Sequence, residues 1–326
     1  MRLADMDMAK RRAIVAAAPG ARAVDLDYVV EKLEVVTLDI AGADGLLAGH
    51  DLMSPYVWEE DGCRRLLVRV LNNPLGAADP TGVIYAGTSH DGLFFNVHPC
   101  PAISPGPRDI DAGGVEDPTV VTAEEGRLLV FFTGVDRPRE QGSLLVAKGP
   151  DLDHLCKEQV LLEAPRGGGN IKEATVAQGA DGRWRLFFEY ARDNASRIGL
   201  ALADAPEGPW RAVADPFTVR PKGWDNWHLS TGPIVARPGE PPVMFYNGAT
   251  ADARWRIGWV AFDENYTCVV DRCVEPMLVP PPPEQRAGTD IAFAASCLDD
   301  GSTIFLYYSL EDRVLRRARI RRYVSN

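Results

Sequence analysis

Two carboxylic acids stand at the same place relative to a downstream glycine turn. Asp117 lies eight residues before Glu125, which opens a Glu-Gly turn. Glu173 lies eight residues before Asp181, which opens an Asp-Gly turn. If the two segments are copies of one structural unit arranged around an axis, their acids converge. Two facing carboxyl groups suit glycosidic-bond cleavage, which needs a protonated acid for the leaving oxygen and a base or an anionic stabiliser opposite. Close carboxylates also separate their pKa values, so that one stays protonated near neutral pH.

The corresponding position in the other units is less uniform. Thr231 occupies it in the fourth unit, and Asp290 in the fifth. In the first unit two residues compete for it: Ser54, which precedes a proline as Asp117 does, and Asp51, which is selected by counting back from the turn. The residue types therefore predict a pocket whose acids are Asp117 and Glu173, with Asp51 as a further candidate.

The elements that would position these residues form a repeat. Each unit has a short strand, a glycine turn and a second strand that ends in paired bulky residues. The turns are Asp61-Gly62, Glu125-Gly126, Asp181-Gly182, Gly239-Glu240 and Asp300-Gly301. From Leu67 the bulky residues recur at Phe132, Phe188, Tyr246 and Tyr308, in steps of 65, 56, 58 and 62 residues. A period of about 60 residues suits a four-stranded propeller blade with generous loops. The sequence therefore predicts an all-β, five-bladed β-propeller, and a two-domain β-sandwich is the alternative.

The propeller is expected to be a single catalytic domain over residues 36–326, preceded by an N-terminal extension over residues 1–35. Residues 8–18 are expected to form a short helix in this extension. Such a helix would pack outside the propeller or in a contact between subunits, which leaves a homo-oligomer open.

Composition excludes several classes of partner. The 326-residue chain has 35 Lys and Arg against 46 Asp and Glu, a net charge of −11, which disfavours nucleic acid and anionic lipid. Nowhere do about 18 apolar residues follow one another, so no membrane span is expected. The six cysteines show no zinc-site spacing, which fits reduced thiols in a cytoplasmic protein. No metal and no cofactor are expected.

Five ordered segments resemble a known family. They read Ser54-Pro55 with Leu66-Leu67-Val68-Arg69-Val70 and Ser89-His90-Asp91-Gly92; Val115-Glu116-Asp117-Pro118; Lys172-Glu173-Ala174; Trp227-His228 through Gly232-Pro233-Ile234; and Phe245-Tyr246-Asn247-Gly248 with Trp255-Arg256-Ile257-Gly258. Across nearly its full length the chain resembles glycoside hydrolase family 130, the five-bladed propeller glycosidases and mannoside phosphorylases. A looser resemblance links it to the propeller clan of families 43 and 32.

The resemblance implies roles for individual residues. Asp117 would be the general acid, and in phosphorylases inorganic phosphate would be the nucleophile. Its binding site would come from basic side chains, namely Arg69, Lys172, Arg192 and His228. In hydrolases a carboxylate would activate water, and the candidates are Glu173 and Asp225. In the looser clan, Asp51, Asp117 and Glu173 would be base, stabiliser and acid. Ser54, Glu116, Trp227 and Asp290 complete the expected substrate- or phosphate-binding set, and Trp224 with Trp227 could stack on a sugar.

Three departures bear on the type of reaction. Thr119 replaces the family's Arg after Asp117-Pro118, Ser54 replaces its Asn, and Glu173 is one methylene longer than the usual Asp. The expected function is inverting cleavage of a short β-linked oligosaccharide, a mannoside, with a lean towards hydrolysis. The alternatives are a phosphate-dependent mannoside phosphorylase, and a sugar-binding propeller that has lost its chemistry.

Overall fold

The computed structural model describes residues 26–40, 47, 49–123, 126–162 and 167–324. The helix predicted over residues 8–18 lies outside these ranges. Within them the fold is all-β, with three single-turn 3-10 segments at Asp109–Asp111, Leu152–His154 and Pro283–Gln285. None of the described helical segments is long or apolar enough to cross a bilayer. The predicted all-β class is therefore confirmed.

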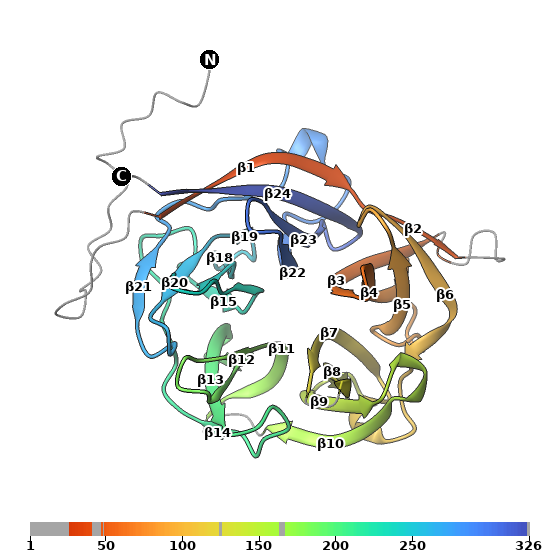
Figure 1. Ribbon diagram of the computed structural model, residues 1–326. Coiled ribbons are helices and arrows are strands. Elements are labelled where there is room, and N and C mark those ends of the chain that lie inside the picture. The colour runs from red at the N-terminus through yellow and green to blue at the C-terminus, as the bar shows by residue number, and fades with distance from the viewer. Residues whose placement is uncertain (1–25, 41–46, 48, 124–125, 163–166, 325–326) are drawn as a thin grey trace.

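The strands form sheets that stand in a ring, with β3, β7, β11 and β22 nearest the centre (Figure 1). The first sheet contains β3 (His50–Glu60), β4 (Cys63–Asn72), β5 (Val83–Ser89), β6 (Phe94–Ile103) and β2 (Thr37–Ile40). The second contains β7 (Gly114–Thr122), β8 (Leu128–Val135), β9 (Gly142–Gly149) and β10 (Cys156–Leu162). The third contains β11 (Gly169–Gln178), β12 (Trp184–Arg192), β13 (Ala195–Ala203) and β14 (Arg211–Ala212). Neighbours pair antiparallel, except β2, which is parallel to β6. This arrangement is a β-propeller.

The next part of the ring consists of two short sheets. One contains β15 (His228–Ser230), β18 (Asn247–Ala249) and β19 (Trp255–Ile257). The other contains β16 (Ile234–Val235), β17 (Val243–Met244), β20 (Val260–Phe262) and β21 (Val269–Arg272). The two sheets use successive stretches of the same chain segments, as β15 then β16, β17 then β18, and β19 then β20. The count of five blades stays a prediction. It requires that these two short sheets together form a single blade whose strands are interrupted.

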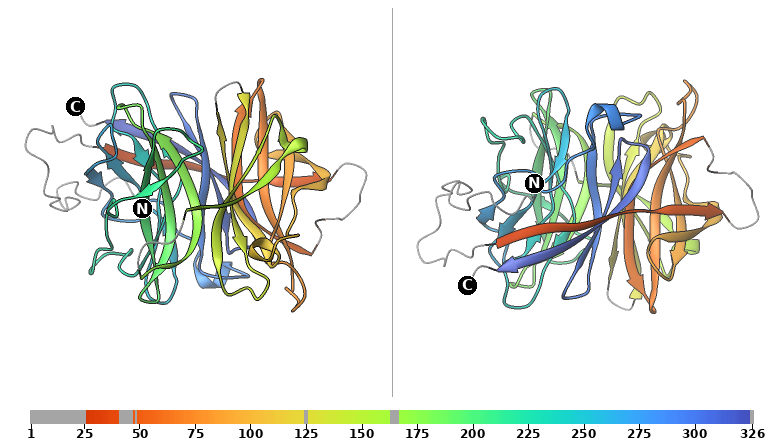
Figure 2. Two further views of the ribbon diagram at one scale, coloured as in Figure 1. Left: turned by 90° about the horizontal axis from the view of Figure 1, so that it is seen from below. Right: turned by 90° about the horizontal axis from the view of Figure 1, so that it is seen from above.

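The last sheet joins the two ends of the described chain. It contains β22 (Ala292–Asp299), β23 (Ile304–Leu310), β24 (Val314–Val324) and β1 (Leu26–Val35). Residues 26–35, assigned above to the N-terminal extension, thus form the outer strand of this sheet. Arg317 of β24 pairs with Glu34 of β1 and also donates to the backbone oxygen of Asp91 in the first sheet. The chain therefore closes its ring by adding an N-terminal strand to C-terminal ones (Figure 2).

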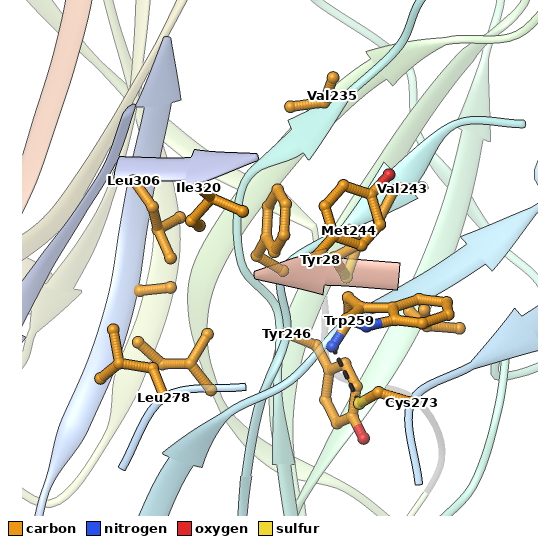
Figure 3. Close-up of a cluster of buried hydrophobic side chains, with 14 of the residues drawn as sticks. Tyr28, Val235, Val243, Met244, Tyr246, Trp259, Cys273, Leu278, Leu306 and Ile320 are labelled. Carbon is orange, nitrogen blue, oxygen red and sulfur yellow. Dashed lines mark hydrogen bonds between the residues drawn. The ribbon is translucent and has the colours of Figure 1, made fainter. Parts of the chain in front are cut away.

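The cores between sheets explain why the bulky residues recur. Phe132, Phe188 and Tyr246 are fully buried, as are their neighbours Phe131, Phe187 and Phe245. The largest core cluster gathers around β17 and β20 and includes Tyr28 of β1 (Figure 3). The Tyr28 ring meets Phe245 at 5.3 Å and Trp259 at 5.5 Å, both edge to face. This packing anchors β1 to the neighbouring sheet as well as to β24.

Candidate active site

Three residues in the first strands of successive sheets share an uncommon backbone conformation. Ser54 in β3, Asp117 in β7 and Glu173 in β11 have φ values of 49°, 52° and 45°. In each strand the pairing register shifts at this residue, so all three are bulge residues. A left-handed backbone is unfavourable for residues with a side chain, and bulges with this strain occur next to active sites, where they re-aim a side chain. The predicted equivalence of Asp117 and Glu173 is therefore matched by the backbone.

The same conformation decides which residue of the first sheet is equivalent. Ser54, and not Asp51, occupies the bulge, and Ser54 Oγ donates a 2.7 Å hydrogen bond to Oδ1 of Asp117. Asp51 instead accepts from Asn73 at 2.9 Å and pairs with Arg313 at 3.2 Å. Asp51 is therefore not the equivalent of Asp117, although its charge contributes to the raised pKa of nearby Asp312, and its role as a catalytic acid stays a prediction. In β22 the register shift falls between Ala294 and Ser296, beyond Asp290.

Two cations accompany the acids, and both are held by Glu116. Arg69 lies 2.8 Å from a Glu116 carboxylate oxygen, 3.6 Å from Asp117 Oδ1, and donates twice to the backbone oxygen of Thr81. Lys172 Nζ lies 3.3 Å from the other Glu116 oxygen. Glu116 is 2% exposed, and its pKa is lowered because Arg69 and Lys172 outweigh the effect of burial. Glu116 thus offsets one of the two positive charges expected to hold phosphate.

Glu173 has an unusual electrostatic environment. Burial raises the pKa of its carboxyl well above the ordinary value, and the nearby charges of Asp117 and Glu189 raise it further. Arg69 and Lys172 oppose this shift without cancelling it. Its environment therefore favours the protonated form of Glu173. Asp117 accepts a hydrogen bond from Ser54 and lies 3.6 Å from Arg69. The pair has the asymmetry that acid–base chemistry requires.

Two further carboxyl groups, Glu189 and Asp312, belong to the same electrostatic cluster and were missed in the sequence. Glu189 of β12 accepts a 2.8 Å hydrogen bond from Ser196, and burial raises its pKa. Burial also raises the pKa of Asp312, in the turn between β23 and β24, although Arg69 opposes the shift. Asp312 has a φ of 54°, and the negative charge of Asp117 contributes to its raised pKa. A turn aspartate and a second-strand glutamate carry no local signal of function, because only the ring brings them to the bulge residues.

His228 and Trp227 lie at the start of β15. The backbone N–H of Ser196 donates to Nδ1 of His228 at 3.1 Å, and the imidazole packs against Trp255 with ring centres 5.5 Å apart. Burial, aided by Arg197, lowers the His228 pKa, so the ring is neutral at neutral pH. Trp227 is 41% exposed, with its indole N–H directed at the backbone oxygen of Asn194 at 3.3 Å. His228 can thus offer a hydrogen bond but not a cation.

Three other residues singled out in the sequence make contacts of their own within the protein. The Arg192 guanidinium lies over the Tyr190 ring, 5.0 Å from its centre. Asp290 is held by Arg256 and Arg286, each at 2.7 Å. Thr119, which stands where the family has Arg, donates to the backbone oxygen of Ala174 at 2.6 Å and so links the second and third sheets. No cation replaces the missing arginine at that position.

The candidate base Asp225 is structural. Its side chain is fully buried, accepts from Tyr246 at 2.6 Å and is paired with both Arg220 and Arg272. Neighbouring Trp224 stacks on Tyr246 with ring centres 5.4 Å apart. A Cβ at Gly258 would lie 2.4 Å from the Trp224 ring, so the fold keeps glycine there to admit the indole. Enclosed in this way, Asp225 is not placed to activate water, and that expectation is corrected. Sugar stacking by the partly buried Trp224 stays a prediction.

In the described ranges no group of three or more metal-ligating side chains is clustered.

The comparisons with known proteins agree with this architecture. The solved β-1,2-mannobiose phosphorylase of Listeria innocua, in complex with β-1,2-mannobiose, matches with a TM-score of 0.70 at 18% identity, covering 86% of this chain and 92% of that one. A structure from work on GH130 glycoside hydrolases that target β-1,2 mannosidic linkages in Candida mannan matches with a TM-score of 0.72 at 19% identity, covering 89% and 94%. The chain has the fold of glycoside hydrolase family 130. The predicted resemblance to that family is thus confirmed in fold.

Sequence similarity is more restricted. A curated β-1,2-mannobiose phosphorylase of Listeria innocua is 29% identical over 97 residues, which are 29% of this chain and 27% of that protein. The match thus spans about a quarter of the relative's length. No family model matches the chain. Family 130 therefore supplies the architecture, and activity has to be argued from the site.

Proposed function

We propose that this protein is an enzyme that cleaves a β-linked mannoside with inversion, using the carboxyl pair Asp117 and Glu173. The observation that carries the proposal is the Asp117 carboxylate, which lies on a strained bulge and acts electrostatically on Glu173, Glu189, Lys172 and Asp312. An unused cluster of buried acids would cost stability through desolvation and repulsion. A pocket that only binds sugar has no need of that cost.

We assign proton donation first to Asp117, as the family resemblance implies. One observation favours a second assignment: burial and the nearby acids raise the pKa of Glu173 well above its ordinary value, which favours its protonated form. In that case Asp117 would be the anionic partner. The two assignments predict different behaviour with substrates whose leaving group needs no protonation.

Asp117→Asn and Glu173→Gln should be compared on β-mannobiose and on nitrophenyl β-mannoside. A variant that lacks the donor loses about 10²–10⁴-fold in kcat/KM on the disaccharide but much less on the activated substrate. Asp117→Asn showing this pattern supports the first assignment, and Glu173→Gln showing it supports the second. If wild type turns over no glycoside on a broad panel, the proposed function is wrong and the sugar-binding alternative stands.

We favour hydrolysis over phosphorolysis. Arg69 and Lys172 are both paired with Glu116, Thr119 replaces a cation, and His228 is neutral at neutral pH. Glu116 offsets one of these two positive charges, and Arg69 also lies 3.6 Å from Asp117, which weakens the attraction for a phosphate dianion. Sugar release should therefore proceed without phosphate and yield free mannose. Strict dependence on phosphate, with mannose 1-phosphate as product, would establish the phosphorylase alternative.

A further inference from the structure

The outer edge of β1 is an unusual feature of this propeller. β1 has 10 residues, whereas the outer strands β2, β10, β14 and β21 have 4, 7, 2 and 4. Short edge strands are a common protection against unwanted pairing, and proline is another. β1 is long, has no proline, and pairs on one side only within the described part of the chain, although it carries a bulge between Val30 and Lys32 and the exposed charges of Glu31 and Lys32. It lies across the outside of the ring, where Figure 2 shows it uncovered by other described elements.

The exposed side chains of β1 are apolar to an unusual degree. Leu33 is 56% exposed, Val35 60% and Val29 42%, and Tyr323 on the adjoining β24 is 48% exposed. Tyr28 of the same strand is buried in the core, whereas Val29 and Leu33 are exposed to solvent. An apolar, unpaired edge of this length is a site for strand addition. We propose that β1 is a dimer interface, on which β1 of a second copy of this chain pairs antiparallel.

The charges on β1 favour a second copy and specify the register. Successive residue pairs in an antiparallel ladder alternate between hydrogen-bonded and non-hydrogen-bonded pairs. A two-fold axis preserves this alternation only if it passes midway between one residue and the same residue of the second copy. An axis at Glu31, Lys32 or Glu34 would place like charges opposite each other, which is unfavourable. An axis at Leu33 places Lys32 opposite Glu34 of the partner subunit, and this favourable pair occurs twice. Lys32 and Glu34 already lie on one face of the strand, where they are 2.9 Å apart.

The Leu33 register also joins the apolar side chains. Leu33 meets its own counterpart on the axis, on the face opposite to Lys32 and Glu34, because paired residues in a ladder share a face. Glu34 is already paired with Arg317 and with Lys32 of its own strand, and its side chain is 8% exposed, so its charge serves chiefly to disfavour registers that place like charges opposite each other. Edge pairing, apolar contact and charge complementarity thus agree on one arrangement.

Sedimentation velocity of the full-length protein across micromolar concentrations tests the proposal. We expect a species of twice the chain mass, and Leu33→Lys should weaken the dimer at least about ten-fold by placing two like charges on the axis. Val160→Lys is the matched control, because Val160 is 42% exposed on the outer strand β10. Circular dichroism of each variant establishes that the fold is retained.

Cysteine crosslinking tests the register. Leu33→Cys should form a covalent dimer under mild oxidation beyond the background from the exposed Cys100 and Cys156 of wild type. Val29→Cys should remain at that background, because in this register Val29 opposes Thr37. A monomer at every concentration, or a dimer that either Leu33 variant leaves as in wild type, overturns the proposal.

Discussion

Ser54 Oγ donates a 2.7 Å hydrogen bond to Asp117 Oδ1, and each residue has a left-handed backbone at the bulge of its own strand, in neighbouring sheets. Ser54 is 6% exposed and Asp117 5%, so water cannot readily replace this bond. The serine therefore orients the carboxylate that the proposed chemistry depends on.

Ser54→Ala should lower both stability and turnover. Removing the hydroxyl leaves a buried carboxylate oxygen without that donor, which costs about 1–3 kcal/mol of unfolding free energy. Because Asp117 is then less well oriented, kcat should fall more than KM rises. Urea unfolding and steady-state kinetics measure the two effects. Ser54→Asn, which keeps a hydrogen-bond donor and tolerates the left-handed backbone, is the control. A fully active Ser54→Ala enzyme would show that the bond does not orient Asp117.

Glu173→Gln should change how stability depends on pH. The folded pKa of Glu173 is raised above the value in the unfolded chain, so the native state holds a proton that the unfolded state releases. Its unfavourable contribution is therefore absent below the unfolded pKa of 4.5 and grows as pH rises towards the folded pKa. Between pH 5 and 8 we expect the unfolding free energy of wild type to decline relative to Glu173→Gln. Parallel curves in urea titrations over this range would contradict the raised pKa.

The spacing of turns predicted the part of the site that repeats along the chain. Asp117 and Glu173 could be found because each sits a fixed distance before its own hairpin turn. Glu189 and Asp312 could not, because they lie in a second strand and in a turn and join the cluster only when the ring closes. In the first sheet, distance from the turn could not select the equivalent residue, because Asp51 lies ten residues and Ser54 seven residues before Asp61.

The pairing of β1 with β24, which closes the ring, could not be predicted from local sequence patterns either. The alternation in residues 26–35 is typical of a strand, yet its partner β24 is far away in the sequence, with Glu34 and Arg317 separated by 283 positions. Asp225 was misassigned for a related reason. A polar residue between two tryptophans resembles a sugar site in sequence, but only tertiary packing shows that two arginines and a tyrosine enclose it.

Asp225→Asn should destabilise the protein without removing a catalytic group. Arg220 and Arg272 would lose their common counter-ion, and breaking a buried pair in this way costs about 3–5 kcal/mol. At a temperature where the variant is folded, kcat per folded molecule should be close to that of wild type. Thermal unfolding gives the first quantity, and kinetics corrected for the folded fraction give the second. A stable variant with kcat lost by orders of magnitude would restore Asp225 as the base.

Trp224→Ala and Trp227→Ala should separate packing from substrate contact. Trp224 is half-buried and stacked on Tyr246, so its removal should cost about 2 kcal/mol of unfolding free energy. Trp227 is exposed, and its removal should cost less than about 0.5 kcal/mol. If the Trp227 indole stacks on a sugar, Trp227→Ala should raise KM for oligosaccharides several-fold, and Trp227→Phe should retain part of the affinity because a flat apolar face remains. Unchanged KM values in Trp227→Ala would show that the Trp227 indole does not contact the substrate.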